Sequence, residues 1–133
     1  MPSVETITPP NTPIPIGPYS HVAKVGDWIT IGGTAGVDPA TGRLAGPDIA
    51  SQTRQVLRNF AVMLEAAGSD LGHVVHVDVY LLDIADFAAM NEVYVEAFAP
   101  FGDHRPARTA IGVAALPKQG AVVTMGLTAV VAG

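Results

Sequence analysis

A chain of 133 residues fits one domain, expected to span residues 1–133, and leaves no room for a second independent core. It has no cysteine, which excludes disulfides, thiolate metal sites and a cysteine nucleophile. The 12 acidic and 7 basic residues give a net charge of −5, and the arginines are scattered, so nucleic-acid binding is not expected.

The composition is apolar, but it is not that of a membrane protein. Hydrophobic residues make up 49% of the chain and charged residues only 14%. No apolar run approaches the ~18 residues that a membrane span needs, and the N-terminus lacks the pattern of a signal peptide. We therefore expect a cytoplasmic protein without a membrane partner, which covers part of its charge-poor surface with identical subunits.

The N-terminal third of the chain predicts strands and loops. Residues 1–15, rich in proline and threonine, predict an extended lead-in. Two β-favouring runs, 19–25 and 28–31, flank Gly26-Asp27 and predict a hairpin. The segment 33–46 is rich in Gly, Asp and Pro and predicts a loop.

The first helix has clear signals at both ends. Pro47-Asp48 marks its start, and Gly68 stands where a glycine commonly follows a helix. Between them, residues at spacings of three and four form a core-facing stripe: Ile49, Thr53, Val56, Leu57, Phe60, Leu64 and Ala67.

The remaining elements alternate between strands and a second helix. Residues 73–82 predict a strand, and a helix follows from about residue 84, with Asp83 or Asp86 as its cap and Pro100 and Gly102 at its end. Its apolar stripe is Phe87, Met90, Tyr94, Ala97 and Phe101. Residues 108–113 and 122–131 predict two more strands. The order ββ-α-β-α-ββ indicates an α+β fold, a mixed sheet with both helices on one face.

The last strand has two different faces. Val123, Met125, Leu127 and Ala129 share one face, and Val122, Thr124, Gly126 and Thr128 share the other. The second set is small and polar, which suits a cleft or a subunit contact.

Two motifs are typical of ligand sites, namely a phosphate loop and a metal site, but their context in the sequence argues against both. The glycine-rich run 32–36 follows a strand, yet no helix begins there, as a phosphate loop requires. The glycines would still allow the backbone of this run to approach a ligand closely, and the sequence leaves that alternative open. His73 and His76 lie three apart on a predicted strand, so they point to opposite faces and cannot share an ion. No metal or cofactor is expected.

Arg108 is the clearest candidate for a binding residue. It follows Pro106-Ala107 and opens an otherwise apolar strand, where a guanidinium needs an anionic partner. Its spacing fits equally a ligand carboxylate or a structural salt bridge to one of three acidic residues: Asp78, Asp83 or Glu92. By themselves, Tyr19 suits a core aromatic and Asn91 a solvated helix face.

Taken together, these patterns resemble the RidA/YjgF/UK114 family of enamine/imine deaminases. The matching segments, in order, are Ile16-Gly-Pro-Tyr-Ser20, Ile31-Gly-Gly33 with Asp38-Pro-Ala-Thr-Gly42, Gln52-Thr53 through Asn59, Glu65-Ala-Ala-Gly68, Asp86-Phe-Ala, Asn91-Glu-Val-Tyr94, Pro106-Ala-Arg-Thr109, and Val113 through Leu116-Pro117. They span nearly the whole chain.

The resemblance implies a chorismate-mutase-like fold, assembled as a homotrimer with ligand clefts between subunits. It implies that Arg108 binds the substrate carboxylate and that Tyr19 lines the cleft, which makes these two the catalytic candidates. The backbone of Gly32 and Gly33 would contact the ligand, and Asn91 corresponds to the family's helix asparagine.

The sequence also departs from the family at the site. Active deaminases of the family's best-known branch carry a glutamate on the last strand that positions the hydrolytic water. The closest match here is Gly126, and Thr124 stands where a neighbouring acidic residue is often found. No Asp or Glu occurs after Asp103. Ala110 replaces a frequent cysteine beside the arginine.

The resemblance favours a hydrolase that releases ammonia and a 2-keto acid from a small carboxylate-bearing enamine or imine such as 2-aminoacrylate. An aminomuconate deaminase-like enzyme is a variant of this hypothesis. The alternative is a non-catalytic protein that binds keto or amino acids at the same clefts. A ribonuclease role, also attached to the family, is disfavoured by the acidic charge balance.

Overall fold

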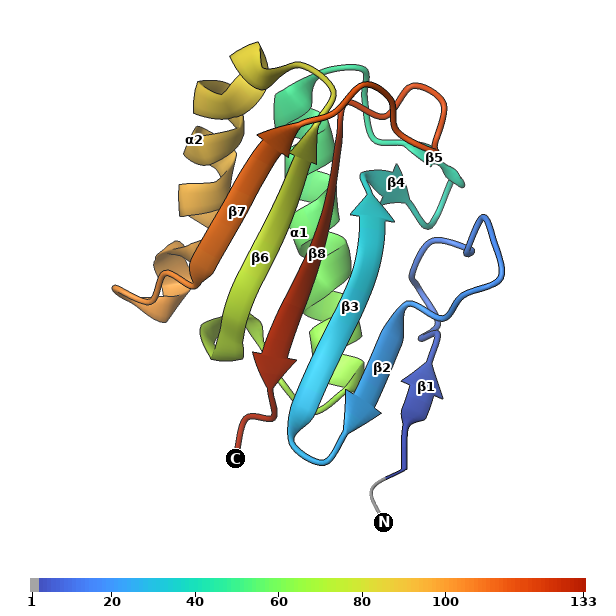
Figure 1. Cartoon of the computed structure of the whole chain (residues 1–133), viewed down its shortest axis with the longest axis vertical. Helices are drawn as coiled ribbons and strands as arrows, with labels where there is room; N and C mark the ends of the chain where they lie inside the picture. Colours follow the sequence, from blue (N-terminus) through green and yellow to red (C-terminus); the bar gives the residue numbers. More distant parts are fainter. Residues whose placement is uncertain (1–2) are drawn as a thin grey trace.

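The computed structural model describes residues 3–133 as one six-stranded sheet with two helices packed behind it (Figure 1). The strand order is β1-β2-β3-β8-β6-β7. The strands are β1 (Glu5–Ile7), β2 (Val22–Val25), β3 (Trp28–Ala35), β6 (Val74–Leu81), β7 (Ala107–Gly112) and β8 (Val123–Val130). The helices are α1 (Ile49–Ala66) and α2 (Phe87–Phe98), and β4 (Val37–Asp38) pairs with β5 (Arg43–Leu44) in a small separate ribbon.

The sheet is mixed because α2 carries the chain from the end of β6 back to the start of β7. That crossover makes β6 and β7 parallel, whereas the other neighbouring strands are antiparallel. The predicted α+β arrangement, with both helices on one face, is confirmed.

The core lies between α1 and the sheet. Phe60, Met63 and Leu64 of α1 are fully buried, as are Val123 and Met125 of β8. The predicted alternation of β8 is confirmed, because its residues are buried and partly buried in turn. Apolar burial of this kind, at roughly 25 cal/mol per Å², is the main stabilising contribution.

The predicted ends of the helices are largely correct. The Asp48 carboxylate accepts a hydrogen bond from the Ser51 amide at 3.1 Å, and Gly68 follows α1 with φ of +83°. Asp83 caps a short 3₁₀ turn, Ile84–Asp86, which leads into α2. The apolar stripe of α2 was predicted less well, since Phe87 and Phe101 are partly exposed and Phe98 is fully buried.

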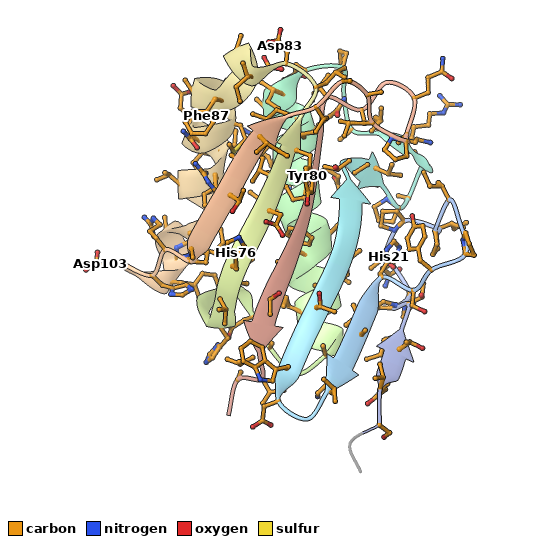
Figure 2. All side chains as sticks on the ribbon, in the orientation of Figure 1. His21, His76, Tyr80, Asp83, Phe87 and Asp103 are labelled. Carbon is orange, nitrogen blue, oxygen red and sulfur yellow. The ribbon has the colours of Figure 1, made fainter. Side chains whose placement is uncertain are left out.

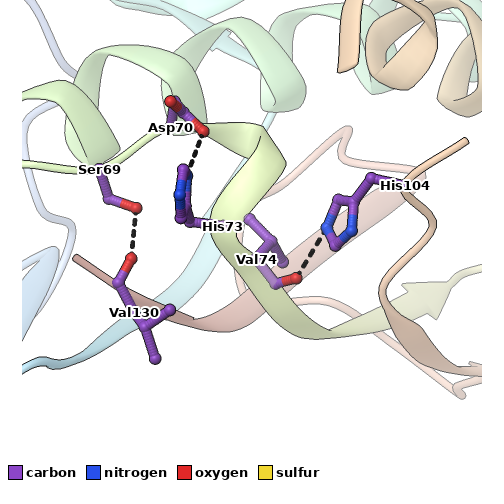
Figure 3. Close-up of polar contacts among 6 residues, drawn as sticks. All are labelled: Ser69, Asp70, His73, Val74, His104 and Val130. Carbon is purple, nitrogen blue, oxygen red and sulfur yellow. Dashed lines mark hydrogen bonds and ion pairs between the residues drawn. The ribbon is translucent and has the colours of Figure 1, made fainter. Parts of the chain in front are cut away.

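The structure adds one strand to the prediction and moves other predicted boundaries. β1 lies inside the segment expected to be an extended lead-in, where it pairs with β2. β3 runs on to Ala35, so the loop expected from residue 33 begins later and contains the β4–β5 ribbon. His73, predicted to be on a strand, lies in the 3₁₀ turn Leu71–His73, where Nδ1 contacts the Asp70 carboxylate at 2.8 Å (Figure 3).

A buried amide in α1 connects two loops. Gln52 is fully buried; its Nε2 donates to the carbonyls of Gly46 at 2.9 Å and Gly120 at 3.1 Å, while its Oε1 accepts from the Val122 amide at 2.8 Å. Two turns later, Asn59 Nδ2 donates to the Val37 carbonyl at 3.0 Å. These bonds fix the segments that follow β3 and precede β8.

We expect Gln52→Met to lower the free energy of unfolding by about 2–4 kcal/mol, because each buried polar group left without a partner costs about 1–3 kcal/mol. Glu65→Met, on the exposed side of the same helix, should change it by less than about 0.5 kcal/mol. Urea unfolding of both variants measures the difference. Equal losses of unfolding free energy in the two variants would contradict the view that the buried hydrogen bonds of Gln52 stabilise the fold.

Candidate functional site

A cavity of about 370 Å³ opens where the segment 13–21 meets the end of β3. We call it the β3 cavity. Its walls include Tyr19, Gly32 and Gly33, three of the residues selected from the sequence, together with Thr124 of β8 and Lys118. The structure therefore places these residues around one hollow.

The two glycines lie in a bulge of β3. Ile31 pairs with Leu127 and Thr34 pairs with Met125, so β3 carries one more residue here than β8 does. A Cβ atom added at Gly32 or Gly33 would meet nothing within 4 Å. The absence of side chains therefore leaves this stretch of backbone open to a ligand.

Tyr19 is held at the cavity by its own segment. Its hydroxyl accepts a hydrogen bond from the Ile16 amide at 3.1 Å, and the buried His21 ring donates from Nε2 to the Pro13 carbonyl. Tyr19 is 43% exposed. The interpretation of Tyr19 as a core aromatic is therefore wrong.

Arg108 lies on the other side of the sheet, against α2. Its guanidinium carbon is 4.7 Å from the centre of the Tyr94 ring and 5.4 Å from that of Phe87, and Nη1 is 3.9 Å from the Met90 sulfur. Both ring contacts are cation–π interactions. None of the ion pairs among residues 3–133 includes Arg108, so the salt bridge considered from the sequence does not form.

Unsatisfied polar groups lie on the same face of α2. Helical spacing puts Phe87, Asn91 and Tyr94 on one side of the helix. The Asn91 Oδ1 and the Tyr94 hydroxyl are buried and have no hydrogen-bond partner among the described residues. We call Arg108, Asn91 and Tyr94 the arginine site. Ala110, two residues after Arg108 on β7, lies on the same side of that strand.

Tyr94 was missed as a functional candidate, because its sequence spacing marks it only as a core residue. Burial raises the pKa of Tyr94 to about 12, although the charges of Arg108 and Arg105 act in the opposite direction. The hydroxyl therefore keeps its proton at neutral pH and can donate a hydrogen bond.

Gly126 lies between these two places, on the side of β8 that faces away from the helices. It pairs with Asp78 of β6, and a Cβ at this position would come within 3.1 Å of the Ile31 carbonyl oxygen. Gly126 is outside the lining of the β3 cavity, whereas Thr124, two residues earlier on the same face, is part of it. Asp78 itself contacts the His76 ring at 3.2 Å.

The β3 cavity and the arginine site are far apart within one chain. β3 and β7 are separated by β8 and β6, three strand spacings or about 14 Å. Figure 2 shows His21, which lines the cavity, and Phe87, which contacts Arg108, at opposite sides of the molecule. A single copy cannot therefore place both groups on one small ligand.

Among residues 3–133, no group of three or more His, Asp or Glu side chains gathers in a way that could hold a metal ion. His104 donates instead to the Val74 carbonyl at 2.9 Å (Figure 3). In the same part of the chain, none of the helices is long and apolar enough to cross a membrane.

Known proteins resemble this chain over most of its length. The model of the family described as Endoribonuclease L-PSP matches residues 9–131. A RutC family protein of Pyrococcus horikoshii is 51% identical over 114 residues, which cover 86% of this chain and 88% of that protein. The 2-iminobutanoate/2-iminopropanoate deaminase of Capra hircus is 43% identical over 116 residues, 87% of this chain and 82% of that one.

The fold is similar to solved structures as well. The crystal structure of the YjgF gene product of E. coli matches with a TM-score of 0.89 and 36% identity, and the match covers 95% of this chain and 98% of that one. Sequence and structure thus agree with the resemblance that the motifs carry. The chain belongs to the Endoribonuclease L-PSP family, the family of the RidA and YjgF proteins.

Proposed function

We propose that this protein is a homotrimeric hydrolase that converts small carboxylate-bearing enamines or imines of the 2-aminoacrylate type into a 2-keto acid and ammonia. The observation that carries the proposal is the partly buried Arg108, which has no carboxylate partner among residues 3–133. The deaminase of Capra hircus, 43% identical, supports the choice of reaction.

Arg108 is suited to hold the substrate carboxylate. A guanidinium binds a carboxylate through two parallel hydrogen bonds, and partial burial between aromatic rings strengthens that attraction. The protonated Tyr94 hydroxyl and the buried Asn91 amide supply further hydrogen-bonding groups beside it.

The complete cleft requires two copies of the chain. Because Arg108 is about three strand spacings from the β3 cavity, we expect the cavity of one subunit to meet the Arg108 of its neighbour. Large apolar side chains support such an assembly: Trp28 is 54% exposed and Ile111 45% exposed, both on the face of the sheet that the helices leave uncovered.

The chemistry needs positioning more than a strong acid or base. An enamine first takes up a proton on its terminal carbon and becomes the protonated imine. Water adds to the imine carbon, and one proton of the added water passes to the nitrogen. The C–N bond then breaks and ammonia leaves, while the remaining hydroxyl proton is lost to solvent and the C=O bond forms. Arg108 holds the carboxylate, while Tyr19, the open backbone at Gly33 and the Thr124 hydroxyl border the space for substrate and water. Correct placement alone lowers the barrier of such a reaction.

Non-catalytic binding of keto or amino acids is the second candidate. The specific observation in its favour is that no Asp or Glu occurs after Asp103, so β8 offers no carboxylate to activate water. An aminomuconate-type substrate is a variant of the first candidate. Either function suits the cytoplasm, since a chain without cysteine needs no oxidising compartment to fold.

Wild-type protein should accelerate hydrolysis of 2-iminopropanoate generated in situ, measured as 2-keto acid release above the spontaneous rate. We expect Arg108→Ala to lower kcat/KM by about 10–150-fold, because a hydrogen bond to a charged group contributes about 1.5–3 kcal/mol. Pyruvate binding, followed by calorimetry, should weaken by a similar factor.

Arg105→Ala is the matched control. Arg105 is exposed, and within the described part of the chain its guanidinium binds only the carbonyls of Gly102 and His104. It should retain wild-type kcat/KM. Equal pyruvate affinity in wild type and Arg108→Ala would refute the proposal that Arg108 binds the carboxylate. Tight pyruvate binding without hydrolysis would favour the binding protein over the enzyme.

A glutamate restored on β8 should raise the hydrolysis rate, by up to the 10²–10⁴-fold typical of general acid–base help. Two positions are available. Gly126→Glu follows the family resemblance but brings a Cβ within 3.1 Å of the Ile31 carbonyl. Thr124→Glu avoids that contact and places the carboxylate in the wall of the β3 cavity.

Melting temperatures separate activation from damage in these two variants. Thr124→Gln, which has the same shape without the charge, is the control and should not gain activity. If both glutamate variants melt like the wild type and neither is faster, a missing acid does not limit the reaction.

A further inference from the structure

We propose that Asp78 of β6 binds the water that attacks the imine and accepts a proton from it. This inference rests on the proposed function and assigns a catalytic residue to one of its steps. None of the described residues that line the β3 cavity is an Asp or a Glu. Ser20, Lys118 and Thr124 line it, but an ammonium group accepts no hydrogen bond and a hydroxyl is a weak base. A carboxylate for the water therefore has to come from beside the cavity.

Asp78 is the one carboxylate that the strands of the described sheet turn away from the helices. These six strands carry two acidic residues, Glu5 and Asp78. Glu5 pairs with Lys24, whose Nζ donates to the backbone at the C-terminal end of α1, so this pair faces the helices. Asp78 alternates with the buried Val77 and Val79 and therefore faces the other way, as Thr124 and Gly126 do.

Asp78 lies directly opposite Gly126 in the antiparallel pair of β6 and β8. The Cβ atoms of residues paired in this way project from one face and lie about 4.5–5.5 Å apart. Because Gly126 has no side chain, the space above it is open beside Asp78; we call this space the Gly126 notch. A Cβ atom added at Gly126 would lie 3.7 Å from the carbonyl carbon of Gly32, a residue of the cavity wall. The notch thus connects Asp78 to the β3 cavity.

The Gly126 notch offers the acceptors that a bound water needs. The carbonyl oxygens of Ile31 and Gly32 lie 3.1 Å and 3.9 Å from the position of the added Cβ atom, on the side opposite Asp78. Buried waters typically make about three hydrogen bonds to polar groups. With acceptors on both sides, a water in the notch can donate both of its hydrogens and keep an oxygen lone pair for attack on the imine carbon.

A histidine on the same strand holds the Asp78 carboxylate. His76 Nε2 lies 3.2 Å from Asp78 Oδ1 and 3.2 Å from the hydroxyl of Thr109 on β7. Figure 2 shows His76 and Tyr80, the two neighbours of Asp78 on this face, along β6 near the middle of the sheet. None of the hydrogen bonds among residues 3–133 uses the second carboxylate oxygen, Oδ2. One oxygen is therefore engaged, and the other can accept from a water.

The proposed step uses Asp78 as a proton carrier. The water oxygen bonds to the imine carbon, the electron pair of the C=N bond moves to nitrogen, and the carboxylate takes one proton of the water. The protonated carboxyl then gives this proton to the amine nitrogen. The C–N bond breaks, ammonia leaves, and the remaining hydroxyl proton is lost to solvent as the C=O bond forms, so Asp78 ends as the carboxylate with which it began.

Asp78→Asn tests the inference, because an amide keeps the shape of the side chain but cannot take the proton. We expect its kcat/KM for 2-iminopropanoate generated in situ to fall by about 10²–10⁴-fold, the range of general acid–base help. Its affinity for pyruvate, measured by calorimetry, should stay within about twofold of wild type, because the lost interaction belongs to the transition state. Asp27→Asn, at an exposed turn between β2 and β3, is the control and should keep both values.

A carboxylate added on β8 gives a readout that a purely structural role of Asp78 would not change. Thr124→Glu places its carboxylate in the cavity wall, on the same face as Gly126. Two groups that serve one water do not contribute additively. Thr124→Glu should therefore raise kcat/KM by at least about tenfold more in the Asp78→Asn background than in the wild type. Equal gains in the two backgrounds would overturn the inference.

The remaining outcomes separate the inference from the proposed function. Wild-type kcat/KM in Asp78→Asn would overturn the inference and leave the proposed function standing. A changed pyruvate affinity in this variant would mean that Asp78 acts on ligand binding, for example by pairing with the Arg108 of a neighbouring copy, and would also overturn it. If the wild type hydrolyses no imine, both fail. Should Asp78→Asn melt or sediment unlike the wild type, Asp78→Ser takes its place with the same expected values.

Discussion

The distance that the sheet imposes between Arg108 and the β3 cavity determines whether one chain can form the complete candidate site. Three strand spacings, about 14 Å, lie between β7 and β3. Arg108 contacts α2, whereas Thr124 lies on the opposite face of the sheet. Neither half is a complete site: among residues 3–133, Arg108 has no acidic partner, and the hollow lacks that anchor. In the proposed assembly, the cavity of one copy would meet the Arg108 of its neighbour, and this one contact would complete both halves.

The interior of each chain is built to keep the cavity in shape. Gln52 joins the loop after β5 to the segment before β8, and Asn59 holds the backbone at Val37. The bulge in β3 then presents bare backbone at Gly32 and Gly33. Gln52 and Asn59, which belong to one of the segments that match the family, thus contribute by fixing the backbone around the β3 cavity.

Local patterns in the sequence predicted the features that depend on local physics. Asp48 and Gly68 were correctly predicted as the ends of α1, and the alternation of β8 correctly divided its two faces. The bulge in β3, the pairing of β1 and the burial of Phe98 depend on long-range contacts, so periodicity missed them. The buried hydroxyl of Tyr94 could be recognised only once its neighbours were in place.

Mixing two defective variants tests the shared cleft most directly. Arg108→Ala removes the anchor, and Gly33→Phe fills the cavity from a position where a Cβ meets open space. Each variant alone should bind pyruvate poorly. If the variants are unfolded together and refolded as mixed oligomers, about a quarter of the clefts should combine an open cavity with an intact Arg108 and regain wild-type affinity. No recovery in oligomers proven to be mixed would contradict a cleft shared between subunits.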